Sequence, residues 1–214
     1  MKIANGEWTF ELDLGEEKLS FRATFYNDAL GKQALSIFNV DEEIVVDELV
    51  WKEDIMYIRM PHFDSEFHAS MISSNELKGV WHNYAKGPDY VIPFVATAKK
   101  AICTPSPNDE AASLGGKWAA TFGAGEDSYP AIGEFIQNGS AVNGTFLTET
   151  GDYRYLAGEF RDERLQISAF DGAHAFLFTA QRQGDGSLWG QFYSGKHWST
   201  YWRAQPNPKA QLRP

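Results

Sequence analysis

Cysteine is nearly absent from this sequence of 214 residues, in which Cys103 is the only one. One thiol can form neither an internal disulfide nor a Cys-x-x-Cys pair, which excludes dithiol redox chemistry within this chain. Apolar runs are short as well, and none approaches the ~18 residues of a membrane-spanning helix. Residues 1–5 are too short for a signal peptide. The protein is therefore expected to be cytoplasmic, or to have an export signal outside this sequence.

Positive charge is also scarce, with 19 Lys and Arg residues against 29 Asp and Glu residues and a formal net charge of −10. Nucleic acids and anionic lipids both need a cationic surface, so neither is expected as a partner. The histidines lack the spacing of a tight zinc motif. The glycine-rich stretches lack the setting of a phosphate loop, and no G-x-S-x-G elbow occurs. We therefore predict no catalytic residue, no metal site and no cofactor.

Alternation of apolar and polar residues dominates the rest of the chain. Trp8, Phe10 and Leu12 share one face of a strand, and the polar residues between them share the other. This period of two indicates strands with one solvated face. Asn138-Gly139 predicts a hairpin with a type I′ turn. After two strands within residues 7–26, the predicted strands are Ala34–Phe38, Glu43–Val50, Ile55–Met60, Glu66–Ser73, Lys78–Tyr84, Tyr90–Thr97, Lys117–Phe122, Ala131–Gln137, Ala141–Leu147, Tyr153–Phe160, Leu165–Phe170, Ala173–Gln181, Leu188–Tyr193 and Trp198–Ala204.

The two halves of the chain repeat each other. The matching motifs are Gly6-Glu7-Trp8 with Gly116-Lys117-Trp118, Trp51-Lys52-Glu53-Asp54 with Phe160-Arg161-Asp162-Glu163, and Leu77-Lys78-Gly79-Val80-Trp81 with Leu188-Trp189-Gly190-Gln191-Phe192. About eight strands per half predict an all-β fold of two similar antiparallel up-and-down meanders. These would form two lipocalin-like or streptavidin-like barrels, or one large curved sheet. We expect a first repeat at 1–98, a connector at 99–115, a second repeat at 116–204 and a C-terminal linker at 205–214.

Three longer motifs carry a family resemblance. They are residues 60–67 (MPHFDSEF), 144–158 (GTFLTETGDYRYLAG) and 168–176 (SAFDGAHAF). Together they resemble the N-terminal region of exported thioredoxin-fold proteins of the Bacteroidetes, of the TlpA-like disulfide reductase or peroxiredoxin family. In that family a β-rich region precedes a redox domain bearing Cys-x-x-Cys, which this chain lacks. The resemblance implies an accessory domain that is periplasmic or otherwise extracytoplasmic, with any redox activity in another domain.

Polar residues in the second half form one candidate site. Asp152, Arg154, Asp171 and His174 would combine carboxylate, guanidinium and imidazole groups on neighbouring strands. Arg binds carboxylates through two parallel hydrogen bonds, so such a group could hold an anionic or amide-bearing ligand. The same aspartates also suit turns, where their side chains bond the local backbone. A ligand site and a purely structural role both remain open.

Aromatic residues form the other candidate site. Trp198 and Trp202 share one parity on the last predicted strand, and Tyr153 and Tyr155 share one on an earlier strand. Exposed rings would stack on a sugar or grip an extended peptide, whereas buried rings would fill a barrel. The complete set of candidate ligand-binding residues is Asp152, Arg154, Tyr155, Asp171, His174, Trp198 and Trp202.

Three functions fit these observations. The first is a non-enzymatic accessory or binding domain that presents a β surface to a client protein or to its own downstream thioredoxin-like domain. The second is a lipocalin-like carrier of a small apolar ligand, which needs an open cavity. The third is a domain that binds or hydrolyses carbohydrate, and hydrolysis would need paired carboxylates such as Asp64 with Glu66.

Overall fold

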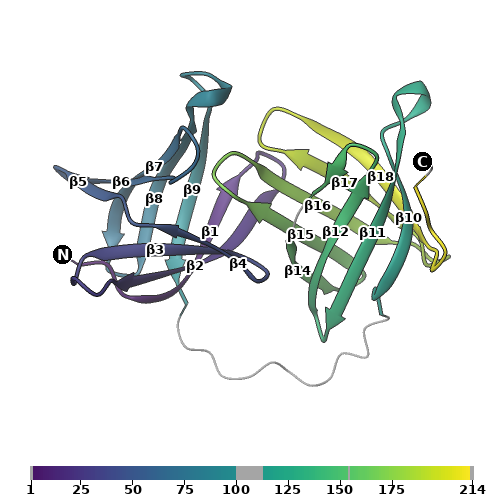
Figure 1. Cartoon of the computed structure of the whole chain (residues 1–214), viewed down its shortest axis with the longest axis horizontal. Helices are drawn as coiled ribbons and strands as arrows, with labels where there is room; N and C mark the ends of the chain where they lie inside the picture. Colours follow the sequence, from purple (N-terminus) through teal and green to yellow (C-terminus); the bar gives the residue numbers. More distant parts are fainter. Residues whose placement is uncertain (1, 100–112, 154, 213–214) are drawn as a thin grey trace. The chain divides into compact units, whose positions relative to one another are not determined.

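The computed structural model describes residues 2–99, 113–153 and 155–212. Two antiparallel sheets of nine strands account for most of these residues, which confirms the predicted all-β fold (Figure 1). The sheets belong to two compact units, so the chain does not form one large curved sheet. Unit 1 comprises the described residues up to 99 together with 170–175, and unit 2 comprises the rest.

The sheet of unit 1 is an up-and-down meander that nearly closes into a barrel. Its strand order is β4-β3-β2-β1-β9-β8-β7-β6-β5, so β1 and β9 pair and β4 and β5 are the two edges. A 3₁₀ turn, η1 (Tyr84–Lys86), follows β8. The strands are β1 (Gly6–Asp13), β2 (Lys18–Asn27), β3 (Gln33–Asn39), β4 (Glu42–Val46), β5 (Leu49–Lys52), β6 (Ile55–Arg59), β7 (Ser65–Ser73), β8 (Glu76–Asn83) and β9 (Val91–Ala98).

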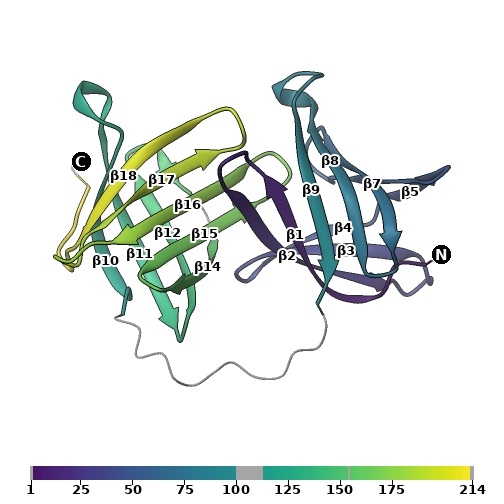
Figure 2. The same ribbon diagram turned by 180° about the vertical axis from the view of Figure 1, so that it is seen from behind.

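The sheet of unit 2 closes completely. Its strand order is β11-β10-β18-β17-β16-β15-β14-β12-β13, and an additional ladder between β11 and β12 completes the ring (Figure 2). A 3₁₀ turn, η2 (Gly125–Asp127), follows β10. The strands are β10 (Gly116–Phe122), β11 (Tyr129–Asn138), β12 (Ala141–Thr148), β13 (Gly151–Asp152), β14 (Leu156–Arg161), β15 (Arg164–Phe170), β16 (Ala175–Arg182), β17 (Leu188–Ser194) and β18 (Ser199–Pro206).

The two repeats share details of hydrogen bonding and packing. Trp8 Nε1 donates to the Ala4 carbonyl at 3.0 Å, and Trp118 Nε1 donates to the Leu114 carbonyl at 2.8 Å. In each repeat, the indole thus donates to the carbonyl four residues before it, at the start of the first strand of the barrel. The duplicated motifs therefore build the same local structure twice.

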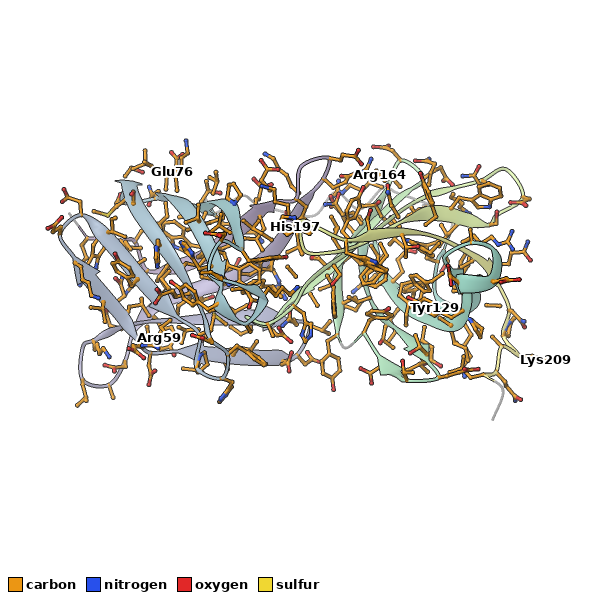
Figure 3. All side chains as sticks on the ribbon, turned by 90° about the horizontal axis from the view of Figure 1, so that it is seen from above. Arg59, Glu76, Tyr129, Arg164, His197 and Lys209 are labelled. Carbon is orange, nitrogen blue, oxygen red and sulfur yellow. The ribbon has the colours of Figure 1, made fainter. Side chains whose placement is uncertain are left out.

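Aromatic rings fill both barrels (Figure 3). In unit 1 the Phe10 ring stacks on Phe21 and on Phe94, with centroids 5.1 and 5.7 Å apart. In unit 2 Phe178 stacks on Phe192 at 4.3 Å. These side chains come from alternate positions of neighbouring strands, so the inward face that the alternation predicts is the buried one.

Three predicted strands are wrong in their extent. The predicted strand Glu43–Val50 is two strands, because the chain changes partner from β3 to β6 around residues 47–48. The predicted strand Tyr153–Phe160 starts only at Leu156, after the short β13. The last strand extends to Pro206, which pairs with Trp118, so the range expected to be linker begins inside β18. A proline is tolerated there because it ends the strand.

The predicted Asn-Gly hairpin joins β11 and β12, but its turn is displaced by one residue. Asn138 pairs with Ala141, so Gly139 and Ser140 are the loop residues. Gly139 has φ +60° and Ser140 does not have a positive φ, which is the pattern of a type II′ turn rather than type I′. Most of the expected connector, including Cys103, lies outside the described residues.

Candidate functional site

Two exposed aromatic side chains lie side by side on the outer face of the unit 2 barrel. Trp189 on β17 is 59% exposed and Tyr201 on β18 is 71% exposed. Trp189 pairs with Arg203 and Gln191 pairs with Tyr201, so the two rings are diagonal neighbours on one face. Diagonal positions lie within reach of aromatic side chains. We call Trp189 and Tyr201 the aromatic platform.

The aromatic platform borders two hollows in the barrel wall. The larger has a volume of about 570 Å³ and extends over β10, β18 and the turn after β10, with Gly123, Ser128 and Arg203 in its lining. The smaller has a volume of about 340 Å³ and extends over β16, with Gln181 and Gln191 in its lining. Trp189 and Tyr201 line both hollows, so the aromatic platform lies between them.

Polar side chains surround the aromatic platform in a cross-strand row. Thr121 pairs with Arg203, Arg203 pairs with Trp189, and Trp189 pairs with Gln181. These partners share the outer face of four adjacent strands, since cross-strand partners point to the same side of a sheet. The surface therefore offers an indole and a phenol ring between a hydroxyl, a guanidinium and an amide.

The structure separates the predicted aromatic residues. Trp202 is 2% exposed and lies in the core, whereas Trp198 is 50% exposed and precedes β18. Their shared parity fails because Trp198 is not part of the strand. Tyr155 is exposed and lies outside a strand, whereas Tyr153 packs against the core with its hydroxyl 3.0 Å from that of Tyr129.

The predicted polar cluster is brought together only in part. Asp171 and His174 are in contact within unit 1, where His174 Nδ1 donates to Asp171 Oδ2 at 3.0 Å. Asp152 is exposed on β13 in unit 2, and Arg154 lies outside the described residues. Asp171 Oδ1 also accepts the backbone N–H groups of Ala173 and His174. Burial raises the pKa of Asp171, but these hydrogen bonds outweigh it, so the pKa lies below its ordinary value.

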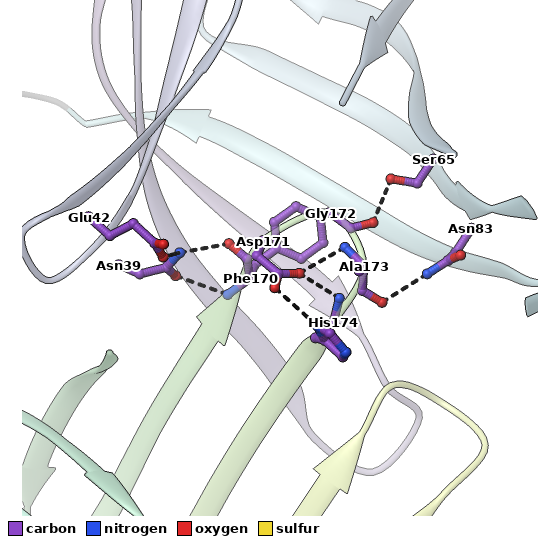
Figure 4. Close-up of polar contacts among 9 residues, drawn as sticks. All are labelled: Asn39, Glu42, Ser65, Asn83, Phe170, Asp171, Gly172, Ala173 and His174. Atoms are coloured by element: carbon purple, nitrogen blue, oxygen red, sulfur yellow. Dashed lines mark hydrogen bonds and ion pairs between the residues drawn. The ribbon is translucent and has the colours of Figure 1, made fainter. Parts of the chain in front are cut away.

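The turn that contains Asp171 is held by buried polar side chains of the unit 1 barrel (Figure 4). Asn39 donates to the Phe170 carbonyl at 2.9 Å and accepts from the Phe170 N–H at 3.0 Å. Ser65 Oγ donates to the Gly172 carbonyl, and Asn83 Nδ2 donates to the Ala173 carbonyl. Asp171 therefore organises a turn, which is the structural role that its sequence context allowed.

Sequence reasoning missed the aromatic platform. It considered Glu66 only as a partner of Asp64, whereas the structure places Glu66 in a second polar group, on the outer face of unit 1. Glu66 Oε1 accepts from His68 Nε2 at 2.7 Å and from the Tyr84 hydroxyl at 2.8 Å. Burial raises the pKa of Glu66, but the hydrogen bonds from His68 and Tyr84, together with the charges of His68 and Arg59, lower it by more, so this pKa lies below its ordinary value. The His82 ring stacks against Tyr84, and burial lowers its pKa. A signal was available, because Glu66 and His68 share a face in any strand that contains both.

Tyr84 gives this polar group a testable pH dependence. Burial, helped by the bond to Glu66, raises the pKa of Tyr84 from 10.0 to about 12. The folded-state pKa exceeds the unfolded one, so this contribution to stability is complete below pH 10 and is lost as the pH rises toward 12. Thermal unfolding followed by circular dichroism should show that stability falls less with rising alkaline pH in Tyr84→Phe than in wild type. Tyr155→Phe is the control, because this tyrosine is 56% exposed. An equal loss of stability in Tyr84→Phe and wild type would contradict this assignment.

Across the described residues, no three His, Cys, Asp or Glu side chains gather so that they could hold a metal ion. The described part of the chain also contains no helix long and apolar enough to cross a membrane.

Comparisons with known proteins identify no family. No protein-family model matches the chain, and no curated protein matches it. One similar solved structure is a protein of unknown function from the DUF3598 family of Nostoc punctiforme PCC 73102, with 10% identity, a TM-score of 0.31 and 94% coverage of both chains. Another is a candidate outer membrane protein of Bacteroides fragilis NCTC 9343, with 8% identity, a TM-score of 0.29 and coverage of 94% of this chain and 97% of that one. Similarity at this level carries no inference about function.

Proposed function

We propose that this chain is a non-catalytic binding module that holds an oligosaccharide on the aromatic platform of unit 2. The observation that carries the proposal is the exposure of Trp189 and Tyr201 on one face, beside two hollows. Large exposed rings are costly in solvent and mark interaction sites when they gather with polar neighbours.

The chemistry around the two rings suits a sugar. A pyranose has an apolar C–H face, which packs on an indole or phenol ring, and a rim of hydroxyl groups, which needs donors and acceptors. Arg203 supplies donors, Thr121 supplies a hydroxyl, and Gln181 supplies both a donor and an acceptor. The row of these residues across β10, β18, β17 and β16 would accommodate more than one sugar ring.

The packing inside unit 2 favours this outer surface over a carrier function. The Phe122 ring contacts Phe146, Phe178 and Phe192 with centroids 5.2 to 5.9 Å apart. A lipocalin-like carrier needs space where these rings lie. A ligand on the aromatic platform requires no such rearrangement.

Trp189→Ala tests the proposal directly. The full chain is titrated by calorimetry with hexasaccharides of glucan, xylan and chitin, and wild type is expected to bind at least one of them. Removal of one stacking ring should weaken this binding about tenfold, since stacking contributes about 1.5 kcal/mol. Trp198→Ala is the matched control, because this tryptophan is similarly exposed but lines neither hollow. The proposal fails if no hexasaccharide binds, or if Trp189→Ala binds as tightly as wild type.

The family resemblance supplies the proposed setting. We infer that the module serves as an extracytoplasmic accessory domain to a thioredoxin-like redox domain on the same polypeptide. A client protein or that redox domain would then be brought to the glycan surface where the module binds. The full open reading frame tests this setting, which requires an upstream export or lipoprotein signal and a downstream Cys-x-x-Cys domain.

A further inference from the structure

The two repeats differ at one boundary between strands. In unit 1 this boundary lies between the edge strands β4 and β5, and we call it the seam. In unit 2, β14 pairs with β15 on one side and with β12 on the other, where Ala141 to Gly144 face Leu156 to Glu159. In unit 1, β5 pairs with β6, and the sheet ends there (Figure 1). The described residues of unit 1 thus leave one side of β5 without a neighbouring strand.

Trp51 shows what the open seam leaves uncovered. Trp51 pairs with Met56 in unit 1, and its counterpart in the repeat, Phe160, pairs with Leu165 in unit 2. Met56 and Leu165 are fully buried, so Trp51 and Phe160 both project from the inner face of their sheets. However, Phe160 is 1% exposed and Trp51 is 42% exposed. An inward-facing indole that is nearly half exposed marks a place where a covering strand is missing.

The backbone of β5 has the geometry to accept that strand. The Glu48 carbonyl accepts the Arg59 N–H at 3.1 Å, so residue 48 directs its hydrogen-bonding groups toward β6. Successive residues of a strand direct these groups to opposite edges. Leu49 and Trp51 therefore present their backbone N–H and C=O groups to the open side. A free edge of this kind pairs with an extended segment of another chain.

The charge of the seam defines the partner. Residues 41–54 contain seven acidic residues and one lysine, namely Asp41, Glu42, Glu43, Asp47, Glu48, Glu53, Asp54 and Lys52. Exposed apolar side chains of β4, β5 and β6 lie among them, at Val45, Val50, Trp51 and Ile55. A second copy of this chain would bring the same acidic seam and the same net charge of −10, so like charges would oppose its pairing. A cationic partner would instead be attracted.

We propose that the seam of unit 1, formed by β4 and β5, binds an extended cationic peptide segment as an added β-strand. The partner's backbone pairs with Leu49 and Trp51, its apolar side chains cover the Trp51 indole, and its Lys or Arg side chains face the acidic residues. This site is separate from the aromatic platform, so the two proposals stand or fall independently.

A fluorescein-labelled decapeptide of alternating Lys and Val tests the proposal on the full chain. Fluorescence polarisation should show saturable binding that weakens as salt is raised, because exposed charges are screened. Peptides with Glu in place of Lys, or with Lys and Val in separate blocks, should not bind. Hydrogen exchange should show new protection in residues 49–52 when the alternating peptide is added.

Variants separate this site from general electrostatic attraction. Trp51→Ala should weaken the binding about tenfold or more, as expected for a central aromatic contact. Ile136→Ala, which removes an apolar side chain that is 76% exposed on β11, should bind as wild type. The proposal is overturned if Trp51→Ala binds as wild type or if the block peptide binds equally well. The proposal is also overturned if sedimentation shows that wild type forms a dimer and Trp51→Ala does not, because the seam would then bind a second copy of this chain.

Discussion

Replacing Phe170 by alanine should lower the free energy of unfolding of unit 1 by about 3 to 5 kcal/mol, the usual cost of removing a fully buried phenylalanine. Phe170 has no solvent exposure. Its ring stacks on Phe21 at 4.5 Å with an interplanar angle of 7°, and it meets the Trp81 ring edge-on at 5.0 Å. A cavity between rings that are fixed by their own strands cannot collapse easily, so the loss should be large.

Urea denaturation and hydrogen exchange together measure this effect. The exchange data should locate the loss of protection in the strands that contribute the contacting rings, which are β2 with Phe21, β7 with Phe67 and β8 with Trp81. Phe63→Ala is the matched control in the same unit, because this side chain is 40% exposed. It should change stability by no more than about 0.5 kcal/mol. A Phe170→Ala protein as stable as the control would show that the ring does not hold the turn in unit 1.

Gly190→Ala should destabilise unit 2 by about 3 to 5 kcal/mol, from overpacking together with a lost hydrogen bond. A Cβ atom at this position would lie 1.8 Å from the Thr179 carbonyl oxygen and 2.6 Å from the Ala180 Cα. The same carbonyl accepts Trp202 Nε1 at 3.1 Å. The backbone would have to move, because neither contact is with the end of a flexible side chain.

Gly184→Ala is the control for this substitution, since no atom lies within 4 Å of its added Cβ. Thermal unfolding of the two variants should differ by several degrees at the least. Gly79, the counterpart of Gly190 in the first repeat, has the same relation to the His68 carbonyl at 1.8 Å. Equal stability of Gly190→Ala and Gly184→Ala would contradict this prediction, because it would mean that β16 and β17 can accommodate the added Cβ without loss of stability.

Much of the fold could be predicted from the sequence because strand patterning is a local property. The alternation around Trp8 and Phe10 places both side chains inside the barrel, where they are fully buried. The repeated glycines at 79 and 190 lie at equivalent positions, where the backbone of the neighbouring strand leaves no room for a Cβ atom. Strand ends were less predictable, since Pro206 ends its strand through pairing with Trp118, a contact across the sheet.

The candidate site was harder to predict for a related reason. Trp189 and Trp202 are both tryptophans in predicted strands, yet one is 59% exposed and the other 2%. Parity within a strand says which residues share a face, but only the closed sheet says which face is inside. Tyr201, which points to the opposite face of the last strand from Trp202, is the tyrosine that borders the hollows.

The sequence by itself determined that this protein is built of antiparallel strands in two similar repeats, because alternation and repetition are properties of residue order. That each repeat forms its own sheet was decided by the tertiary structure. Only the tertiary structure decided that one barrel closes and the other keeps an open seam, which Phe160 and Trp51 report at equivalent positions. It also decided that the turn after β15 belongs to unit 1, where Asn39 holds its backbone. Closure and burial depend on which strands meet across the sheet, and the free energy of those long-range contacts has no local signature in the chain.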